Sequence, residues 1–144
     1  ANGIVYASRP LVYNGSLINN FWIKFKDGKV IDYDAEIGKD ILKSIINIEN
    51  GNYLGEVALV DKTSPIFKSN TIFYETLYDE NASCHLALGQ GFTECIDTVK
   101  ELNDIGFNNS LTHVDFMIGT DDLDIVAECD KGKIKIMENG KFTI

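Results

Sequence analysis

The two histidines of this chain, His85 and His113, each stand close to acidic residues. His113 begins the segment H-V-D-F-M-I-G, in which Asp115 follows two residues later. On a strand, side chains at positions i and i+2 point to the same side. An imidazole and a carboxylate presented together are suitable ligands for a divalent cation. The spacing therefore predicts part of a metal site on a strand that begins at His113.

Two further segments supply carboxylates. Asp79 and Glu80 precede His85 in Y-D-E-N-A-S-C-H-L-A-L-G, and a loop that bends back over the start of a strand would bring Glu80 near His85. Glu56 is the single acidic residue inside the apolar run G-E-V-A-L-V, where a buried carboxylate needs a partner. We interpret these residues as candidate ligands that meet on one sheet.

Each of these residues also has a simpler structural interpretation. His113 and Asp115 can form a surface ion pair, His85 can be a hydrogen-bonded loop histidine, and Glu56 can be a charge that keeps an edge strand soluble. The metal interpretation gains weight because both histidines lie in acidic contexts. Cys84 would point away from His85 on a strand, which argues against a Cys–His nucleophile pair. The acidic cluster after Gly119 lacks the spacing of an EF-hand loop.

The elements that must position these residues are mostly strands. Asp27-Gly28 joins two alternating segments into a hairpin, Asn19–Lys26 and Lys29–Tyr33, and a second hairpin is predicted near the end of the chain. Its segments are Leu123–Cys129 and Lys133–Met137, followed after Asn139-Gly140 by Lys141–Ile144. Helices are predicted at Lys39–Ile48 and Asp97–Asp104. Strands or strand-plus-loop segments are predicted at Leu54–Asp61, Thr71–Tyr78, Cys84–Leu88 and His113–Ile118. The fold class is therefore α+β: a mixed, sheet-dominated single domain with hairpins at both ends and two or three helices.

Composition narrows the function classes. The chain has 144 residues, which fits one domain, and its formal net charge of -9 suits cations and disfavours nucleic acid. No apolar run approaches the roughly 20 residues that span a bilayer, so we expect no membrane segment. The odd count of 3 cysteines indicates free thiols in a reducing, cytoplasmic compartment. Because the first residue is Ala1 and not Met, we expect a processed chain or a piece of a longer protein.

The same motifs carry a family resemblance. The chain resembles the thermophilic-type metallo-aminopeptidases, also called aminopeptidase T, aminopeptidase S or aminopeptidase II, in four segments. These are S-R-P-L-V-Y-N-G-S-L-I-N-N-F (8–21), G-E-V-A-L-V-D (55–61), F-Y-E-T-L-Y-D-E-N-A-S-C-H-L-A-L-G (73–89) and H-V-D-F-M-I-G (113–119). The resemblance implies that residues 1–144 are the C-terminal metal-binding catalytic domain, a fragment of a longer, homodimeric enzyme. It implies peptide substrates with a free N-terminus and two divalent metal ions. We expect zinc or cobalt, although the ligand types also accept manganese or magnesium.

The ligands that the resemblance implies are Glu56, Glu80, His85, His113 and Asp115. We expect Glu56 to bridge the two ions. Glu80 and His85 would complete one coordination sphere or share in the bridging, and His113 and Asp115 would serve the other ion. The catalytic base is then Glu56 or Glu80. The family has a further glutamate ligand upstream of the matched region and a tyrosine where this chain has Phe92, so we expect the isolated chain to bind metal weakly and to have little activity. The alternative is a non-enzymatic β-rich dimerisation or ligand-binding module, whose stability would not respond to metal.

Overall fold

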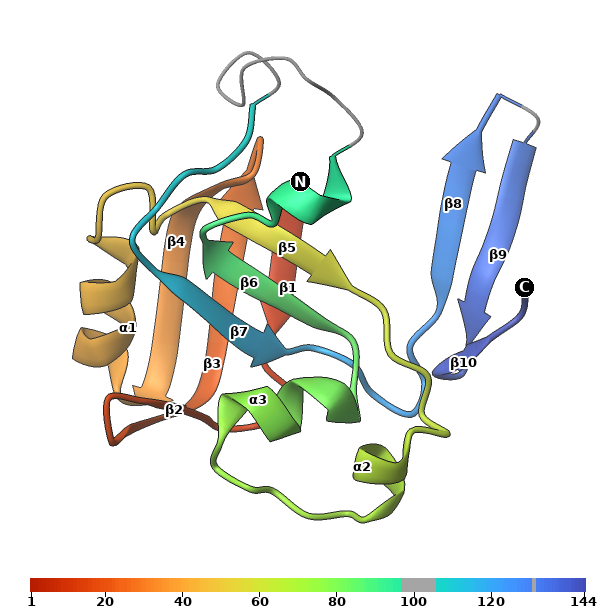
Figure 1. Ribbon diagram of the computed structural model, residues 1–144, viewed down its shortest axis with the longest axis horizontal. Coiled ribbons are helices and arrows are strands. Elements are labelled where there is room, and N and C mark those ends of the chain that lie inside the picture. Colours follow the sequence, from red (N-terminus) through yellow and green to blue (C-terminus); the bar gives the residue numbers. More distant parts are fainter. Residues whose placement is uncertain (97–105, 131) are drawn as a thin grey trace.

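The computed structural model describes residues 1–96, 106–130 and 132–144, and its elements form three antiparallel sheets (Figure 1). Two of the sheets pack on a shared apolar core, with strands β5–β7 lying across strands β1–β4 (Figure 1). The third sheet is a ribbon that projects from this body (Figure 1). The predicted α+β, sheet-dominated class is confirmed. No helix in the described part of the chain has the length and apolarity needed to cross a membrane.

The first sheet is built around one long strand. Strand β3 (Ser16–Lys26) pairs with β1 (Gly3–Tyr6) and β2 (Leu11–Tyr13) along one edge and with β4 (Lys29–Ile37) along the other. Asp27 and Gly28 adopt φ angles of 51° and 78°, as a two-residue hairpin turn requires. The predicted hairpin is confirmed, while β1 and β2 were not predicted.

A single residue in β3 changes which positions face the core. Ile18 is fully buried, yet the next core positions are Phe21, Ile23 and Phe25, so the alternation shifts by one residue. Asn20 lies between them with a φ of 48°, in the left-handed region that asparagine tolerates. This local kink rotates the strand so that both apolar sets point inward.

Helix α1 (Lys39–Ile46) closes one side of this core. Its Leu42 and Ile45 are buried against the sheet, with Ile41 and Ile46 partly buried beside them. The helix predicted over Lys39–Ile48 is confirmed, ending at Ile46. The second predicted helix, Asp97–Asp104, lies outside the described residues.

The second sheet brings together the segments that carry the candidate ligands. Strands β5 (Leu54–Ala58), β6 (His85–Gly89) and β7 (His113–Met117) are antiparallel, with β6 in the middle. One face of this sheet enters the core through Leu86, Leu88, Val114 and Phe116. The ring of Phe116 packs against that of Phe21 at 5.7 Å. Because side chains alternate along a strand, burial of this apolar face determines which side chains lie on the opposite face, and these include the polar ones.

The strand-type prediction for Thr71–Tyr78 is wrong. After α2 (Pro65–Lys68) the chain forms a loop, then helix α3 (Thr76–Asp79) and the 3-10 turn η1 (Glu80–Ala82). The buried carboxylate of Asp79 accepts hydrogen bonds from the backbone N–H groups of Phe73 and Glu75, at 3.0 and 3.2 Å. These bonds, together with a φ of 56° at Tyr74, bend a segment whose aromatic and β-branched residues favour a strand. The short turn η2 (Thr93–Cys95) follows β6.

The third sheet confirms the predicted C-terminal hairpin. Strands β8 (Ile125–Cys129) and β9 (Gly132–Glu138) pair, and β10 (Lys141–Phe142) adds to the other edge of β9. Met137 is fully buried at the base of this ribbon, where its sulfur lies 3.8 Å from that of Cys84. The ribbon therefore joins the body near the start of β6.

Candidate metal centre

Strand register explains how the candidate ligands meet. Glu56 on β5 is opposite Ala87 on β6, and Ala87 is opposite Asp115 on β7. His85 lies two residues before Ala87, and His113 two residues before Asp115, so all of these side chains share one face. Ala87 is fully buried and carries only a methyl group. The space above it is therefore left to the longer side chains on either side.

A glycine allows β5 to approach the site. Gly55 lies where the β5–β6 register shifts, and a Cβ atom at this position would overlap the carbonyl oxygens of Gly89 and Gln90. Any other residue would push β5 outward. The G-E pair of the G-E-V-A-L-V segment thus has a structural reason, because Gly55 permits the contact that brings Glu56 over the sheet.

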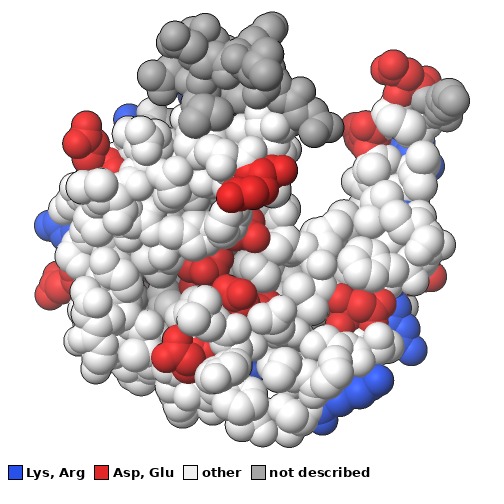
Figure 2. Space-filling model, viewed as in Figure 1, with Lys and Arg blue, Asp and Glu red and all other residues white. Residues whose placement is uncertain are grey.

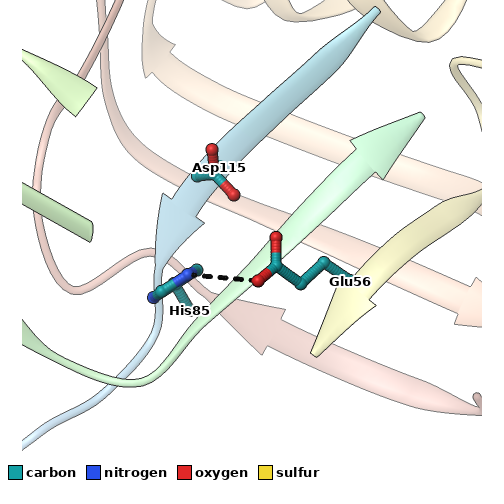
Figure 3. Close-up of side chains that lie close together, drawn as sticks. All are labelled: Glu56, His85 and Asp115. Atoms are coloured by element: carbon teal, nitrogen blue, oxygen red, sulfur yellow. Dashed lines mark ion pairs between the residues drawn. The ribbon is translucent and has the colours of Figure 1, made fainter. Parts of the chain in front are cut away.

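Three of the predicted ligands form a compact group. One ligand atom from each of Glu56, His85 and Asp115 lies within 4.8 Å of the others. Figure 3 shows the three side chains pointing toward one another from three different strands, with Glu56 Oε1 lying 3.8 Å from His85 Nε2. Two carboxylates and an imidazole converging in this way are a suitable donor set for a divalent cation.

His113 lies on the other side of the same carboxylates. Its Nε2 is 3.2 Å from Glu56 Oε2 and 3.1 Å from Asp115 Oδ1. The hydrogen bond to Asp115 is the largest cause that raises the pKa of His113 to about 9, against partial burial, which lowers it. The Gln90 carbonyl and the charges of Asp115 and Glu56 raise this pKa further. Without a metal ion, the imidazolium neutralises part of the negative charge of the site.

The two histidines are held in the same way. His113 Nδ1 donates to the backbone carbonyl of Gln90 at 2.7 Å, and His85 Nδ1 lies 3.2 Å from the backbone carbonyl of Ser83. Because a carbonyl oxygen only accepts, each Nδ1 carries its hydrogen, and each Nε2 faces Glu56. This arrangement of a second hydrogen bond behind the ligand is typical of metal-binding histidines.

Glu80 lies near this group but is not one of the three residues whose ligand atoms are within 4.8 Å of one another. It begins turn η1, which packs against β7, and burial is the largest cause that raises its pKa. The charges of Asp115 and Glu56 raise this pKa further, while His85 and His113 lower it. These mutual effects place the Glu80 carboxylate within electrostatic reach of the other predicted ligands.

Carboxylates surround the centre, and one aromatic ring contacts it. In Figure 2, Asp and Glu side chains gather in the middle of the face where β5–β7 and α3 lie. The ring of Phe92 meets the imidazole of His113 edge-on, with 4.9 Å between ring centroids. A cluster of carboxylates that is partly buried from solvent attracts cations strongly.

Sequence reasoning missed the residues that act through small size or through the backbone. Ala87 shares the alternation of His85, which was a usable signal, but its role depends on the register with β5 and β7. The Ser83 and Gln90 carbonyls carry no signal, because every residue has one.

Comparison with known proteins shows the family to which the chain belongs. A family model described as thermophilic metalloprotease (M29) matches residues 1–142. The chain is 46% identical over 148 residues to aminopeptidase AmpS of Bacillus subtilis (strain 168), covering 98% of this chain and 36% of that protein. It is 49% identical over 138 residues to aminopeptidase 2 of Geobacillus stearothermophilus, covering 92% of this chain and 33% of that protein. The solved structure of wild-type AmpT from Thermus thermophilus superposes with a TM-score of 0.92 at 36% identity, covering 98% of this chain and 36% of that one. The chain thus spans about a third of the length of these relatives.

Proposed function

Because the chain belongs to the thermophilic metalloprotease (M29) family, we propose that it is the C-terminal metal-bearing domain of an aminopeptidase. The substrates are peptides with a free N-terminus, and the reaction is hydrolysis of their first peptide bond. The complete enzyme, a cytoplasmic homodimer, is the active species, because this chain covers 36% of the aminopeptidase AmpS that it resembles.

The observation that best supports a metal-dependent hydrolase is the position of Glu56. One carboxylate oxygen of Glu56 faces His85 and the other faces His113. A carboxylate between two histidines is suited to bridge two divalent ions, with Asp115 and Glu80 filling the remaining positions. We propose zinc or cobalt as the ions. When bound, two such ions activate a water molecule and polarise a carbonyl group.

The residues of the chain have distinct roles in this proposal. Glu56 would contact both ions, because its two carboxylate oxygens face the two histidines. The general base is Glu56 or Glu80; of the two, Glu80 lies outside the compact group of Glu56, His85 and Asp115, so it is the ligand that can more readily leave an ion to take up a proton. The negative charge around the site attracts the α-ammonium group of the substrate, which selects N-termini over internal peptide bonds.

Glu56→Gln is the direct test. Thermal unfolding of the chain is measured with EDTA and with zinc, and a metal concentration of a hundred times Kd should stabilise the native state by about 2.7 kcal/mol. The variant should lose this stabilisation, while Glu128→Gln on the exposed ribbon should keep it. In the complete enzyme, the same change at Glu56 should abolish hydrolysis of a leucine anilide. If zinc leaves the unfolding of the unmodified chain unchanged and Glu56→Gln also leaves the complete enzyme active, the alternative of a β-rich module without metal would be favoured.

A further inference from the structure

One peptide unit, the one that joins Gln90 to Gly91, lies directly behind the predicted metal ligand His113. The ladder between β6 and β7 ends at the pair Gly89 and His113, so Gln90 lies just beyond it. There the Gln90 carbonyl oxygen accepts the Nδ1–H of His113 at 2.7 Å, where a strand would offer it a backbone N–H. The direction of this carbonyl group therefore determines the direction of the imidazole ring.

Backbone hydrogen bonds hold this peptide unit on two sides. In a trans peptide the N–H points away from the carbonyl group, and the Gly91 N–H donates to the carbonyl oxygen of Asn108 at 2.9 Å. The Gln90 N–H donates to the carbonyl oxygen of Thr112 at 2.7 Å. Gly89 permits this approach, because it has a φ of 98° and a Cβ atom there would lie 2.0 Å from the Thr112 carbonyl oxygen.

The side chain of Gln90 adds a third attachment. Its Oε1 accepts the backbone N–H of Ser110 at 2.8 Å, and its Nε2 donates to the Gly91 carbonyl oxygen at 3.2 Å. The first contact needs an acceptor and the second a donor, and a carboxamide group supplies both. Both bonds are partly buried from solvent, so their loss leaves polar groups without partners. The side chain thus ties Gln90 to the segment that leads into His113.

We propose that Gln90 is a positioning residue for the metal ligand His113: its side chain fixes its own carbonyl group, and this carbonyl group keeps Nε2 of the imidazole directed at the metal centre. The inference rests on the proposed function, because this orientation matters only when Nε2 binds an ion. His85 is a reference within the same chain, since its Nδ1 lies 3.2 Å from a different carbonyl group, that of Ser83. Loss of the Gln90 side chain should therefore affect one histidine and spare the other.

Three variants separate this role from a general contribution to the loop. Gln90→Met removes both side-chain hydrogen bonds and keeps a side chain of similar length. Gln90→Glu keeps an acceptor for the Ser110 N–H and serves as the rescue variant. Ser110→Ala is the matched control, because it removes the hydrogen bonds that its hydroxyl makes with the Glu49 carbonyl and the Thr112 N–H but keeps its own N–H.

Two measurements are made on each variant. Zinc affinity is measured by competition with a chromophoric chelator, both for the chain and for the complete enzyme. The exchange of the Nδ1–H of His113 and of His85 with water is followed by proton–nitrogen NMR on the metal-free chain. The His85 signal also reports whether a variant has kept its fold, so a misfolded variant is not mistaken for a displaced histidine.

Gln90→Met should lower zinc affinity about tenfold, as expected when a group behind a metal ligand is lost. The Nδ1–H of His113 should exchange faster in this variant, with that of His85 unchanged. Gln90→Glu should restore the slower exchange, and Ser110→Ala should keep both the exchange and the zinc affinity of the unmodified chain. If Gln90→Met leaves the His113 signal unchanged, or if Ser110→Ala weakens zinc binding equally, the inference is wrong and the proposed function stands. If neither the chain nor the complete enzyme binds zinc, the proposed function fails and the inference fails with it.

Discussion

Metal binding at this centre should release a proton from His113. In the metal-free chain, the Asp115 carboxylate raises the pKa of His113 to about 9, and a metal ion needs the unprotonated Nε2. The proton and the metal ion therefore compete for one nitrogen. The apparent affinity for metal should rise about tenfold per pH unit up to about pH 9 and then level off.

The magnitude follows from the distance between the working pH and this pKa. At pH 7, about two units below it, proton competition weakens binding about a hundredfold, or about 2.7 kcal/mol. At pH 7.5, binding should release about one proton from this residue. A histidine with its ordinary pKa near 6.5 would release only about 0.1 proton at the same pH, and its metal affinity would change little above pH 7.

Calorimetric titration in buffers of different ionisation enthalpy counts these protons directly. The pKa of His113 is measured separately by NMR on the metal-free chain, with His113→Asn to assign the signal. Asp115→Asn should lower that pKa toward 6.5, because it removes the largest cause of the shift. Glu80 is the other group whose raised pKa could supply a proton. If the proton comes from His113, Glu80→Gln should release as many protons on metal binding as the unmodified chain. Metal affinity that is constant between pH 7 and 8 would refute the reasoning.

Four further perturbations test the structural argument. Ala87→Val should lower metal affinity at least tenfold, because its added methyl groups stand between two carboxylates; calorimetry beside a circular dichroism spectrum separates this loss from misfolding. Asp79→Asn should cost about 1–2 kcal/mol in urea unfolding, because an amide can accept only one of the two backbone hydrogen bonds; exposed Asp32→Asn is the control. Phe116→Ala should cost about 3–5 kcal/mol by the same measurement, since its ring is buried behind the site. The metal-free chain should lose about 1–3 kcal/mol of stability as pH rises from 6.5 through about 9, because the folded pKa of His113 lies above the unfolded one and its contribution is complete only below pH 6.5; stability that is flat across this range would contradict the assignment.

The parts of the site that local sequence encodes were predictable. The i, i+2 spacing of His113 and Asp115 determines that both point to one side of β7, and the structure places them in contact at 3.1 Å. The position of Glu56 relative to these two residues was harder to predict from the sequence, because it depends on β6 pairing with both β5 and β7. Such pairing joins residues far apart in the chain, and a one-residue change of register would turn the ligands to the other face.

Tertiary hydrogen bonds explain the clearest failure of the sequence prediction. The segment T-I-F-Y at residues 71–74 has strand propensity, yet the buried Asp79 carboxylate binds its backbone and bends it into a loop. Strands β1 and β2 escaped prediction for the related reason that they are short and depend on β3 for their pairing. In each case a partner distant in sequence outweighs the local preference.

The separation of core and site predicts that the fold does not depend on metal. The apolar face of β5–β7 belongs to the cluster that includes β3, β4 and α1, while the ligands occupy the opposite face. Charges on that face repel one another, but the protonated His113 lies within 3.2 Å of both Glu56 and Asp115 and offsets this repulsion in the metal-free state. EDTA should therefore remove the metal-dependent stabilisation and leave a cooperative unfolding transition with a native-like circular dichroism spectrum. A chain that unfolds when metal is removed would instead place the metal ions among the determinants of folding, as in small zinc domains.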